Sequence, residues 1–457
     1  MHFLSKYLMV KSEMLNMKYE KMFILILLFF TQFVLISRTG SCDTSPSKTK
    51  EEVGADKPKE KPAGTLNIQW LINEAMEHNP EIIAVRQRLN ASASRISQAK
   101  SLEDPMFRAG SFNMSNQPLN INGQTSMLQQ RYAVTQKIPF PGKLAMRGKI
   151  ATQESKMAEE DLLAKVQEIT ALVKTAFYDL FYVNRAIAIT EENRELLRKF
   201  SKIAETKYAV GKTSQRDVLS AQVELSTLTN ELIVLNKEKE SVVAMMNVLL
   251  DRHPQHPLGD PPLIEIHNLD VTLEGLENLA SNNRPELKKY DHAIKRDEAQ
   301  LKLSRKDYYF MDFEPMVEYM QNDGNPDAWA SSITINIPWL WPKNRARVEE
   351  ANEALSASRS EHRYINNKTL FEVKDYFVRL QSSKSTVNLF KTGVIPQAEQ
   401  ALKAAQIGYE ADIIDFLSLI DSQRVLLDSQ LQYYKSVVDY ETNLANLERA
   451  VGIQLSQ

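Results

Sequence analysis

The longest regular pattern in the chain is a run of apolar residues at three- and four-residue spacing. From Gly148 to Val210 there is no proline and no glycine after the first residue. A continuous helix over this stretch would be on the order of 90 Å long at 1.5 Å per residue. The apolar positions that mark its packed face include Leu163, Val166, Ile169, Leu172, Val173 and Phe177. A rod of this length must pack along other helices, as in a coiled coil or a helical barrel.

Alternating apolar and polar residues predict β-strands ahead of each long helical stretch. The apolar positions of these segments are Tyr132, Val134, Ile138, Ile333, Ile335 and Ile337, and the polar ones are Arg131, Thr135, Lys137, Ser332, Thr334 and Asn336. The turns expected at Ser115–Gln124 and Gln321–Pro326 are polar, as exposed hairpin loops are. One apolar and one polar face fits a membrane strand with a wet interior, and it fits a half-buried hairpin equally well.

The chain contains an internal duplication with an offset of about two hundred residues. The recurring landmarks are Asn79-Pro80-Glu81-Ile82 with Arg284-Pro285-Glu286-Leu287, and Ile138–Lys143 with Ile337–Lys343. Each half is predicted to hold a helix of about thirty residues, two strands, a very long helix, a tight turn and another long helix. The second long helix, from Asn344, contains Gly393 and Pro396, so we expect a kink or offset there. We place the first repeat at residues 65–260 and the second at 261–457.

The N-terminal region has the composition of an export signal. Lys18 and Lys21 precede an apolar run from Met22 to Ile36, and small residues follow it. We assign residues 1–41 to a signal peptide, with a start at Met17 as an alternative; the competing interpretation is a membrane anchor. Cys42 then lies where a lipidated cysteine would lie, with lipidation left open. Residues 42–64 are charged and nearly free of large apolar residues, which predicts a flexible tether.

Composition and motifs argue against an enzyme. The 56 basic and 58 acidic side chains nearly balance, so no basic excess indicates nucleic-acid binding. Cys42 is the single cysteine, which excludes an internal disulfide and a cysteine-built metal cluster. No phosphate loop or nucleophile elbow occurs, and the pair His253 and His256 lies in a proline-rich turn without supporting ligands. We expect no catalysis, no cofactor and no metal site.

Four membrane strands in one chain would leave two unpaired edges, which hydrocarbon does not tolerate. A wet channel therefore needs several copies, and three copies would supply about twelve strands and a lumen. The expected architecture is mainly α with a transmembrane β-barrel portion. Two tandem repeats, each a β-hairpin with a long helical hairpin, would build a trimeric α/β-barrel duct.

Three motifs resemble those of the TolC-like outer-membrane efflux proteins. They are Gln136–Leu144 followed by Arg147, then Tyr208-Ala209-Val210-Gly211 leading to Asp217-Val218-Leu219, and finally the echo from Tyr409 to Arg424. The first motif is most similar to the branch that works with cation-efflux pumps. The resemblance implies a homotrimer in the outer membrane of a Gram-negative bacterium, with a periplasmic helical extension. It also implies a periplasmic adaptor, an inner-membrane pump and contact with outer-membrane lipid.

The resemblance further implies functional residues at the two turns between long helices. The adaptor-docking tips correspond to Val210, Gly211, Lys212, Thr213, Ala411, Asp412, Ile413 and Ile414. Asp412 stands where glycine is usual, which leaves the geometry of the second turn open. The aperture positions correspond to Asp217, Tyr409, Ser418 and Asp421. Three copies of Asp421 would form an acidic ring that favours cations, while the alternative is a carboxylate that simply faces solvent.

The predicted function is a passive outer-membrane exit channel of a tripartite efflux system. One alternative is the outlet of a type I protein secretion system. Another, of a different class, is a periplasmic coiled-coil scaffold or adaptor without transport. The sequence does not choose between metal, drug and polypeptide as cargo.

Overall fold

The computed structural model describes residues 66–115, 126–264, 266, 269, 271–322 and 326–455. The predicted signal peptide, Cys42, the predicted tether and most of the turn at Ser115–Gln124 lie outside the described residues. Residues Ala63–Gln457 belong to one structural unit. The description that follows concerns this unit.

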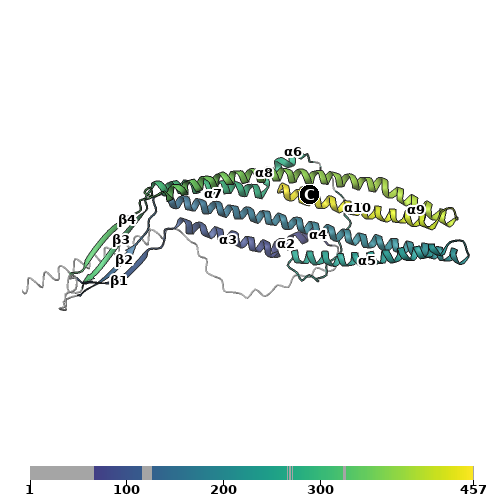
Figure 1. Ribbon diagram of the computed structural model, residues 1–457, viewed down its shortest axis with the longest axis horizontal. Helices are drawn as coiled ribbons and strands as arrows, with labels where there is room; N and C mark the ends of the chain where they lie inside the picture. The colour runs from purple at the N-terminus through teal and green to yellow at the C-terminus, as the bar shows by residue number, and fades with distance from the viewer. Residues whose placement is uncertain are drawn as a thin grey trace, which may run out of the picture. The chain divides into compact units, whose positions relative to one another are not determined.

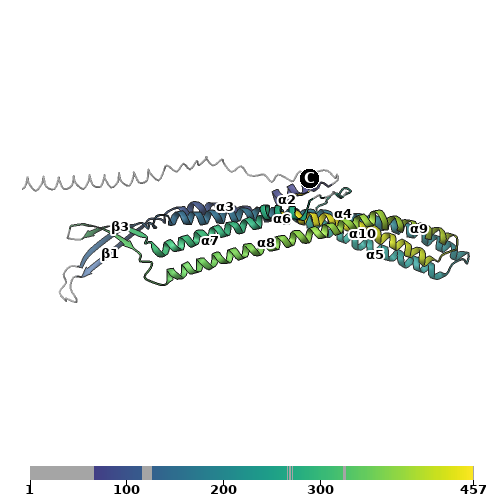
Figure 2. The same cartoon turned by 90° about the horizontal axis from the view of Figure 1, so that it is seen from above.

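The same order of elements occurs twice along the chain. The first series comprises α2 (Ile68–His78), α3 (Pro80–Lys100), β1 (Met106–Ser115), β2 (Ser126–Thr135), α4 (Lys143–Ala209) and α5 (Gln215–Leu249). The second comprises α6 (Leu273–Asn283), α7 (Pro285–Tyr309), β3 (Phe313–Asn322), β4 (Ala328–Ile335), α8 (Lys343–Leu389), η1 (Phe390–Val394), α9 (Ile395–Glu410) and α10 (Phe416–Val451). Figure 1 shows the strands at one end of the unit and the turns between the long helices at the other. Figure 2 gives the same arrangement from a second direction.

The prediction of a single thirty-residue helix at the start of each half was wrong. The helix divides at Asn79-Pro80 in the first half and at Arg284-Pro285 in the second. Proline lacks an amide hydrogen and disfavours helical geometry in the residue before it, so one helix ends and the next begins there. Asn79 caps the new helix, because its side chain accepts hydrogen bonds from the amides of Glu81 (2.9 Å) and Ile82 (3.3 Å).

The very long helix of the first half is continuous. Helix α4 has 67 residues, which corresponds to about 100 Å. Ile169, Val173 and Phe177 are buried along it, as their spacing predicts, but Leu163 and Leu172 are 47% and 37% exposed. Leu172 precedes Val173 by one residue and so lies about 100° away from the buried stripe. Nothing in the described part of the chain covers Leu163.

The matching helix of the second half is interrupted where glycine and proline occur. The chain passes through the five π-helical residues of η1, and the amide of Ile395 donates to the carbonyl of Phe390. Pro396 cannot donate within the next turn, so the wider turn before it removes the conflict with the ordinary α-helical pattern. The expected offset near Gly393 and Pro396 is thereby confirmed.

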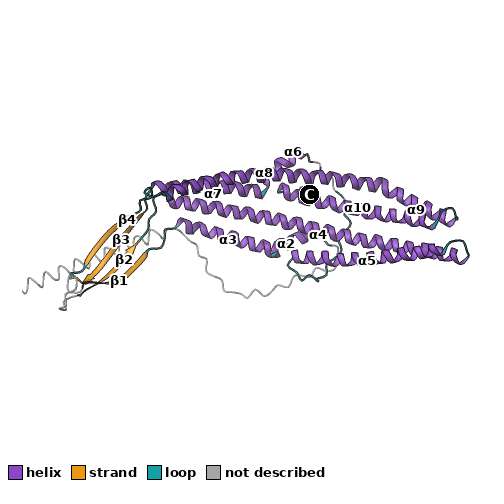
Figure 3. Ribbon diagram, viewed as in Figure 1, coloured by secondary structure: helices purple, strands orange, loops and turns teal. Residues whose placement is uncertain are grey.

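The strands form a sheet whose two faces differ sharply. The described strands pair antiparallel in the order β1-β2-β3-β4, so β1 and β4 are its edges. Phe107, Val134, Val317 and Ile333 share one face and are between 42% and 69% exposed. The opposite face carries Arg108, Arg131 and Glu318. No described helix packs across the sheet, and Figure 3 shows it projecting from the helices.

The hydrophobic core is distributed along the helices in successive clusters. One cluster, near the turns, joins α4 and α5 to α9 and α10 through Leu197, Phe200, Leu402, Phe416 and Leu419. Others lie where α2 meets α4 and α5, and where α6 meets α8 and α10. Among the described residues, no helix has both the length and the apolar character to cross a membrane.

Candidate functional site at the hairpin tips

The two tips have the same backbone design. Helix α4 ends before Val210 and helix α9 ends before Ala411, and in each case the second turn residue is left-handed: Gly211 has φ 75° and Asp412 has φ 59°. The amide of the next residue donates back to the helix, from Lys212 to the carbonyl of Lys207 and from Ile413 to that of Gly408, both at 2.8 Å. This six-to-one hydrogen bond defines a Schellman cap. The doubt about the second turn is resolved, since Asp412 adopts the geometry of the usual glycine.

Charged contacts hold Asp412 in this conformation. The Lys207 ammonium, on α4, donates to the Asp412 carboxylate and to the backbone carbonyl of Tyr409. Lys212 lies 3.4 Å from the same carboxylate. The hydrogen bond from Lys207 is the main cause that lowers the pKa of Asp412. The charge that replaces glycine at the second tip is thus neutralised by the first hairpin, and the two tips are joined.

Three of the predicted tip and gate residues meet between the hairpins. Tyr409 is only 4% exposed; its ring lies 5.3 Å from that of Phe416, and the Lys207 ammonium lies 4.4 Å from its centroid. Burial raises the pKa of Tyr409. Thr213 lies beside the Tyr409 hydroxyl and donates its own hydroxyl to the Asp217 carboxylate. Thr213, Asp217 and Tyr409 therefore form one group.

The other two gate candidates lie apart from this group. The backbone amide of Ser418 donates to the Asp415 carboxylate at 3.2 Å, and the Ser418 hydroxyl donates to the same carboxylate. Asp415 is the N-cap of α10. The hydrogen bonds from Ser418 lower the pKa of Asp415. Asp421 is exposed one turn further along α10. Within one chain, Ser418 has a capping role and Asp421 faces solvent.

Two contacts that the sequence did not predict lock the hairpins together below the tips. The Arg424 guanidinium donates to the buried Glu224 carboxylate through two of its nitrogens, Nε at 2.9 Å and Nη2. The Gln423 side chain donates to the carbonyl of Asn193 at 3.0 Å. In each contact, one partner comes from the first half of the chain and the other from the second half. Their pairing depends on how α5, α10 and α4 pack, which no local motif records.

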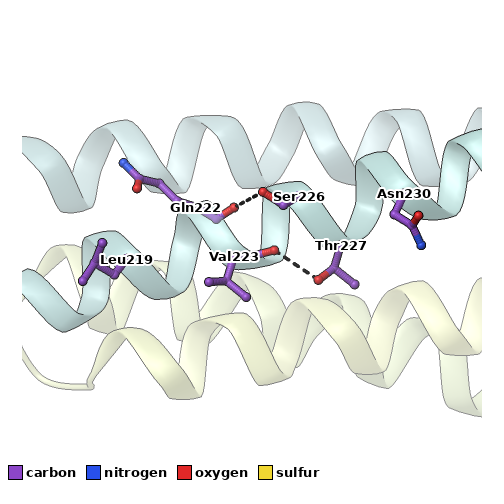
Figure 4. Close-up of a pocket in the computed structure, with 6 residues that line it drawn as sticks. All are labelled: Leu219, Gln222, Val223, Ser226, Thr227 and Asn230. Carbon is purple, nitrogen blue, oxygen red and sulfur yellow. Dashed lines mark hydrogen bonds between the residues drawn. The ribbon is translucent and has the colours of Figure 1, made fainter.

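Each tip exposes one large apolar side chain that the described residues leave largely uncovered. Val210 and Ile413 are 66% and 78% exposed, one on each tip. A shallow groove follows the exposed side of α5 from there (Figure 4); it is lined by Leu219, Gln222, Val223, Ser226, Thr227 and Asn230. The hydroxyls of Ser226 and Thr227 donate to backbone carbonyls one turn earlier, so the polar groups that the groove side chains present are mainly the amides of Gln222 and Asn230.

The described residues contain no cluster of histidine, cysteine or carboxylate side chains that could hold a metal ion. The turn with His253 and His256 has a structural arrangement instead. The side-chain amide of Asn247, which is buried, donates to the carbonyls of Pro254 (3.1 Å) and His256 (2.7 Å). This amide fixes the end of α5 against the turn that follows it.

Comparisons with known proteins point in one direction. A family model described as "Outer membrane efflux protein" matches residues 71–246 and again residues 276–453. The chain is 22% identical to the cobalt-zinc-cadmium resistance protein CzcC of Cupriavidus metallidurans, over 85% of this chain and 91% of that protein. It is 19% identical to the toxin and drug export protein A of Aggregatibacter actinomycetemcomitans, over 84% and 85%. The solved structure of CusC aligns with a TM-score of 0.74 at 16% identity and covers 90% of this chain and 100% of that one.

Proposed function

Because the chain belongs to the outer membrane efflux protein family and is an outer-membrane efflux channel, we propose that it is the passive exit duct of a tripartite system. An inner-membrane pump would deliver the substrate, and a periplasmic adaptor would connect the pump to this chain. The energy for transport would come from the pump, which agrees with the absence of a catalytic motif in the sequence.

The observation that carries this proposal is the uncovered apolar face of the sheet. Phe107 and Ile333 are each 69% exposed there, although such side chains are normally buried in a water-soluble domain. Tyr132, Tyr319 and Trp329 form an aromatic row across the strands on the same face. An apolar band with an aromatic row is typical of strands that face lipid, and the arginines on the other face suit a wet interior.

We propose three copies per channel. Three four-stranded sheets would give a twelve-stranded barrel in the outer membrane, and the helices would form a tube in the periplasm. The exposed Val210 and Ile413 would dock the adaptor, with the α5 groove extending that surface. Thr213, Asp217 and Tyr409 would hold the hairpins closed, and Asp421 would supply the acidic ring.

For the N-terminal part we retain the proposals made from the sequence. Residues 1–41 would direct export, Cys42 is the candidate position for lipidation, and residues 42–64 would form a flexible tether. The repeats would span residues 65–260 and 261–457.

We propose metal cations as the cargo class, supported by the similarity to a cobalt-zinc-cadmium resistance protein. Export of drugs or a polypeptide is the second candidate, supported by the similarity to a toxin and drug export protein. A deletion strain should lose tolerance to cobalt, zinc or cadmium and regain it when the gene is restored. Unchanged metal tolerance together with new sensitivity to drugs or loss of a secreted protein would favour the second candidate. A chain that purifies without detergent as a monomer would refute the duct itself.

A further inference from the structure

A buried ion pair joins the first half of the chain to the second where the helices meet the sheet. Lys143, the first residue of α4, is 1% exposed. Its ammonium contacts the Asp312 carboxylate at 2.7 Å and the carbonyl of Phe310 at 2.9 Å. The ring of Phe140 stacks on that of Phe310 with centroids 4.2 Å apart. We call these four residues the internal junction.

The duplicated motif in the second half has no such partner within the chain. Lys343 is the first residue of α8, as Lys143 is of α4, yet it is exposed and has no ion pair among the described residues. Trp339, Leu340 and Trp341 replace Phe140 and are 50%, 65% and 70% exposed. The second-half counterparts of Lys143 and Phe140 are thus exposed to solvent.

The pairing of the strands fixes which residues correspond in the two halves. Ile138-Pro139 corresponds to Ile337-Pro338, and by the same shift Thr135 corresponds to Thr334. Thr135 pairs with Met106, whereas Thr334 pairs with Glu314. Met106 therefore corresponds to Glu314. Continuing this register to the start of the two strands, Asp104 corresponds to Asp312, and the two residues are identical in type.

Applied to the pairing of β2 with β3 inside the chain, this correspondence predicts a matching pairing between two copies. Within the chain, Thr135 of β2 pairs with Met316 of β3. The equivalent of Thr135 is Thr334 on β4, and the equivalent of Met316 is Arg108 on β1. Both β4 and β1 are edges of the sheet in the described chain. A second copy of this chain could continue the sheet with the same geometry.

We infer that β4 of one copy pairs antiparallel with β1 of the next copy, with Thr334 opposite Arg108 and Ile333 opposite Ala109, and that Lys343 binds Asp104 of that next copy. The inference rests on the ring of copies proposed above and adds its register and its ion pair. In this register Ile333 and Ala109 both lie on the apolar face, and Thr334 and Arg108 both lie on the polar face. A shift by one residue would mix the two faces.

The helices support the same partner. Helix α4 packs against both α3 and α7, whereas α8 packs against α7 and no packing of α8 along α3 is found in the described chain. On α4, Gln153 and Asp161 contact His292 and Lys289 of α7. Counted from Lys143 and Lys343, the matching residues of α8 are Glu353 and Glu361, which are exposed and lack ion pairs among the described residues.

Helix α3 carries the complementary charge. Arg86, Arg88 and Arg95 are exposed, and the described part of the chain provides no ion pair for them. By the correspondence of Pro80 with Pro285, Gln87 matches His292, so Arg86 and Arg88 on either side of it lie near Glu353 if α3 of the next copy lies on α8 as α7 lies on α4. A single contact between copies would then bring acidic residues of α8 next to basic residues of α3. This complementarity of charge supports another copy of the same chain as the partner of both surfaces.

A disulfide cross-link tests the register directly. Ile138 and Phe313 exchange both backbone hydrogen bonds (2.7 and 3.0 Å), so by alternation the Thr135–Met316 pair, and hence Thr334–Arg108, is of the close type without hydrogen bonds. Its Cα atoms are expected about 4.5 Å apart, within the range for disulfides. The full-length Arg108→Cys/Thr334→Cys variant, purified in detergent and oxidised, should run as covalent dimers and trimers that reductant removes.

Matched controls separate register from random collision. The variant Phe112→Cys/Thr334→Cys keeps both thiols on the same face but displaces one by four residues, or about 13 Å, and should give at least tenfold less cross-link. Each variant with only one of the introduced cysteines, which also retains Cys42, reports any cross-link made through Cys42. Equal cross-linking of the matched and displaced pairs overturns the inferred register.

A charge exchange tests the ion pair. Lys343→Glu should lower the temperature at which the oligomer dissociates, and adding Asp104→Lys to the same chain should restore it, because every contact between copies then holds one charge of each sign. A double variant no better than the single one overturns the Lys343–Asp104 pair. A conducting, heat-sensitive oligomer without the matched cross-link refutes this inference alone, whereas a monomer in detergent refutes the proposed ring as well.

Discussion

Replacing Lys174 by methionine should destabilise the helical bundle strongly. Lys174 of α4 forms an ion pair with Glu448 of α10, and the two side chains are 10% and 8% exposed. Their neighbours Val173 and Leu447 belong to two different hydrophobic clusters. The pair therefore lies inside the packing that holds the first half against the last helix. Methionine would fill much of the lysine volume but leave the Glu448 charge without its cation.

The size of the effect follows from burial. Removing one partner of a buried pair generally costs about 3–5 kcal/mol, because the remaining charge stays desolvated. Glu448 also accepts the amide of Leu455 at 2.9 Å, which places the expected loss near the lower end, at about 3 kcal/mol. For a unit of this length that corresponds to a decrease in melting temperature of roughly 5 °C.

The measurement is thermal unfolding of the purified protein in detergent, with two reference variants. Lys237→Met removes an ion pair of good geometry with Glu240 at 2.7 Å, but both side chains are about two-thirds exposed, so the melting temperature should hardly change. Lys174→Met/Glu448→Leu removes both charges and should recover most of the loss. If Lys174→Met melted at the same temperature as Lys237→Met, the reasoning from burial would be refuted.

Further predictions concern the tips. Lys207→Met should increase protease cleavage within residues 411–415 severalfold, and adding Asp412→Gly should suppress the increase, because glycine enters the left-handed region freely; equal cleavage of both variants would contradict this role of Lys207. Because Lys207 lowers the pKa of Asp412, the ion pair should persist until the pH falls below the ordinary aspartate pKa of about 3.9. Pepsin cleavage of the second tip should therefore rise only below that pH. A rise near about pH 5 would argue against this ion pair. Asp421→Ala should reduce cation preference in single-channel recordings, and an unchanged conductance and preference would exclude the acidic ring.

The sequence predicted the long elements because their signals are local. The interval from Gly148 to Val210 lacks residues that end a helix, and α4 is continuous through it. Gly393 and Pro396 predicted the interruption that η1 forms. The division of the early helices follows from Pro80 and Pro285, because a proline at the first position of a helix begins a new helix there, whereas the apolar spacing alone predicts one continuous helix.

The sequence predicts the site residues within each turn, but it does not predict the contacts between the two hairpins. The turn positions and the exchange of glycine for Asp412 are visible in the sequence, but Lys207 was not recognised as its partner. The two residues lie on different hairpins, and their contact depends on the packing of α4 against the second hairpin. A charged residue at a position that normally requires glycine is the signal that could have prompted a search for a counter-charge.

The duplication shows which contacts of the first half have no counterpart in the second half of the described chain. The long helix of the first half finds a short helix on each side, α3 from its own half and α7 from the second. The long helix of the second half has α7 from its own half, and in the proposed ring α3 of another copy would take the position equivalent to α7 on its other side. If copies were added in an open row, the position beside α8 of the last copy would stay empty, however many copies the row contained. The closed ring proposed above would leave none, and it would account together for Lys343, which has no ion pair among the described residues, for the exposed Trp341 and for the open edges of the described sheet.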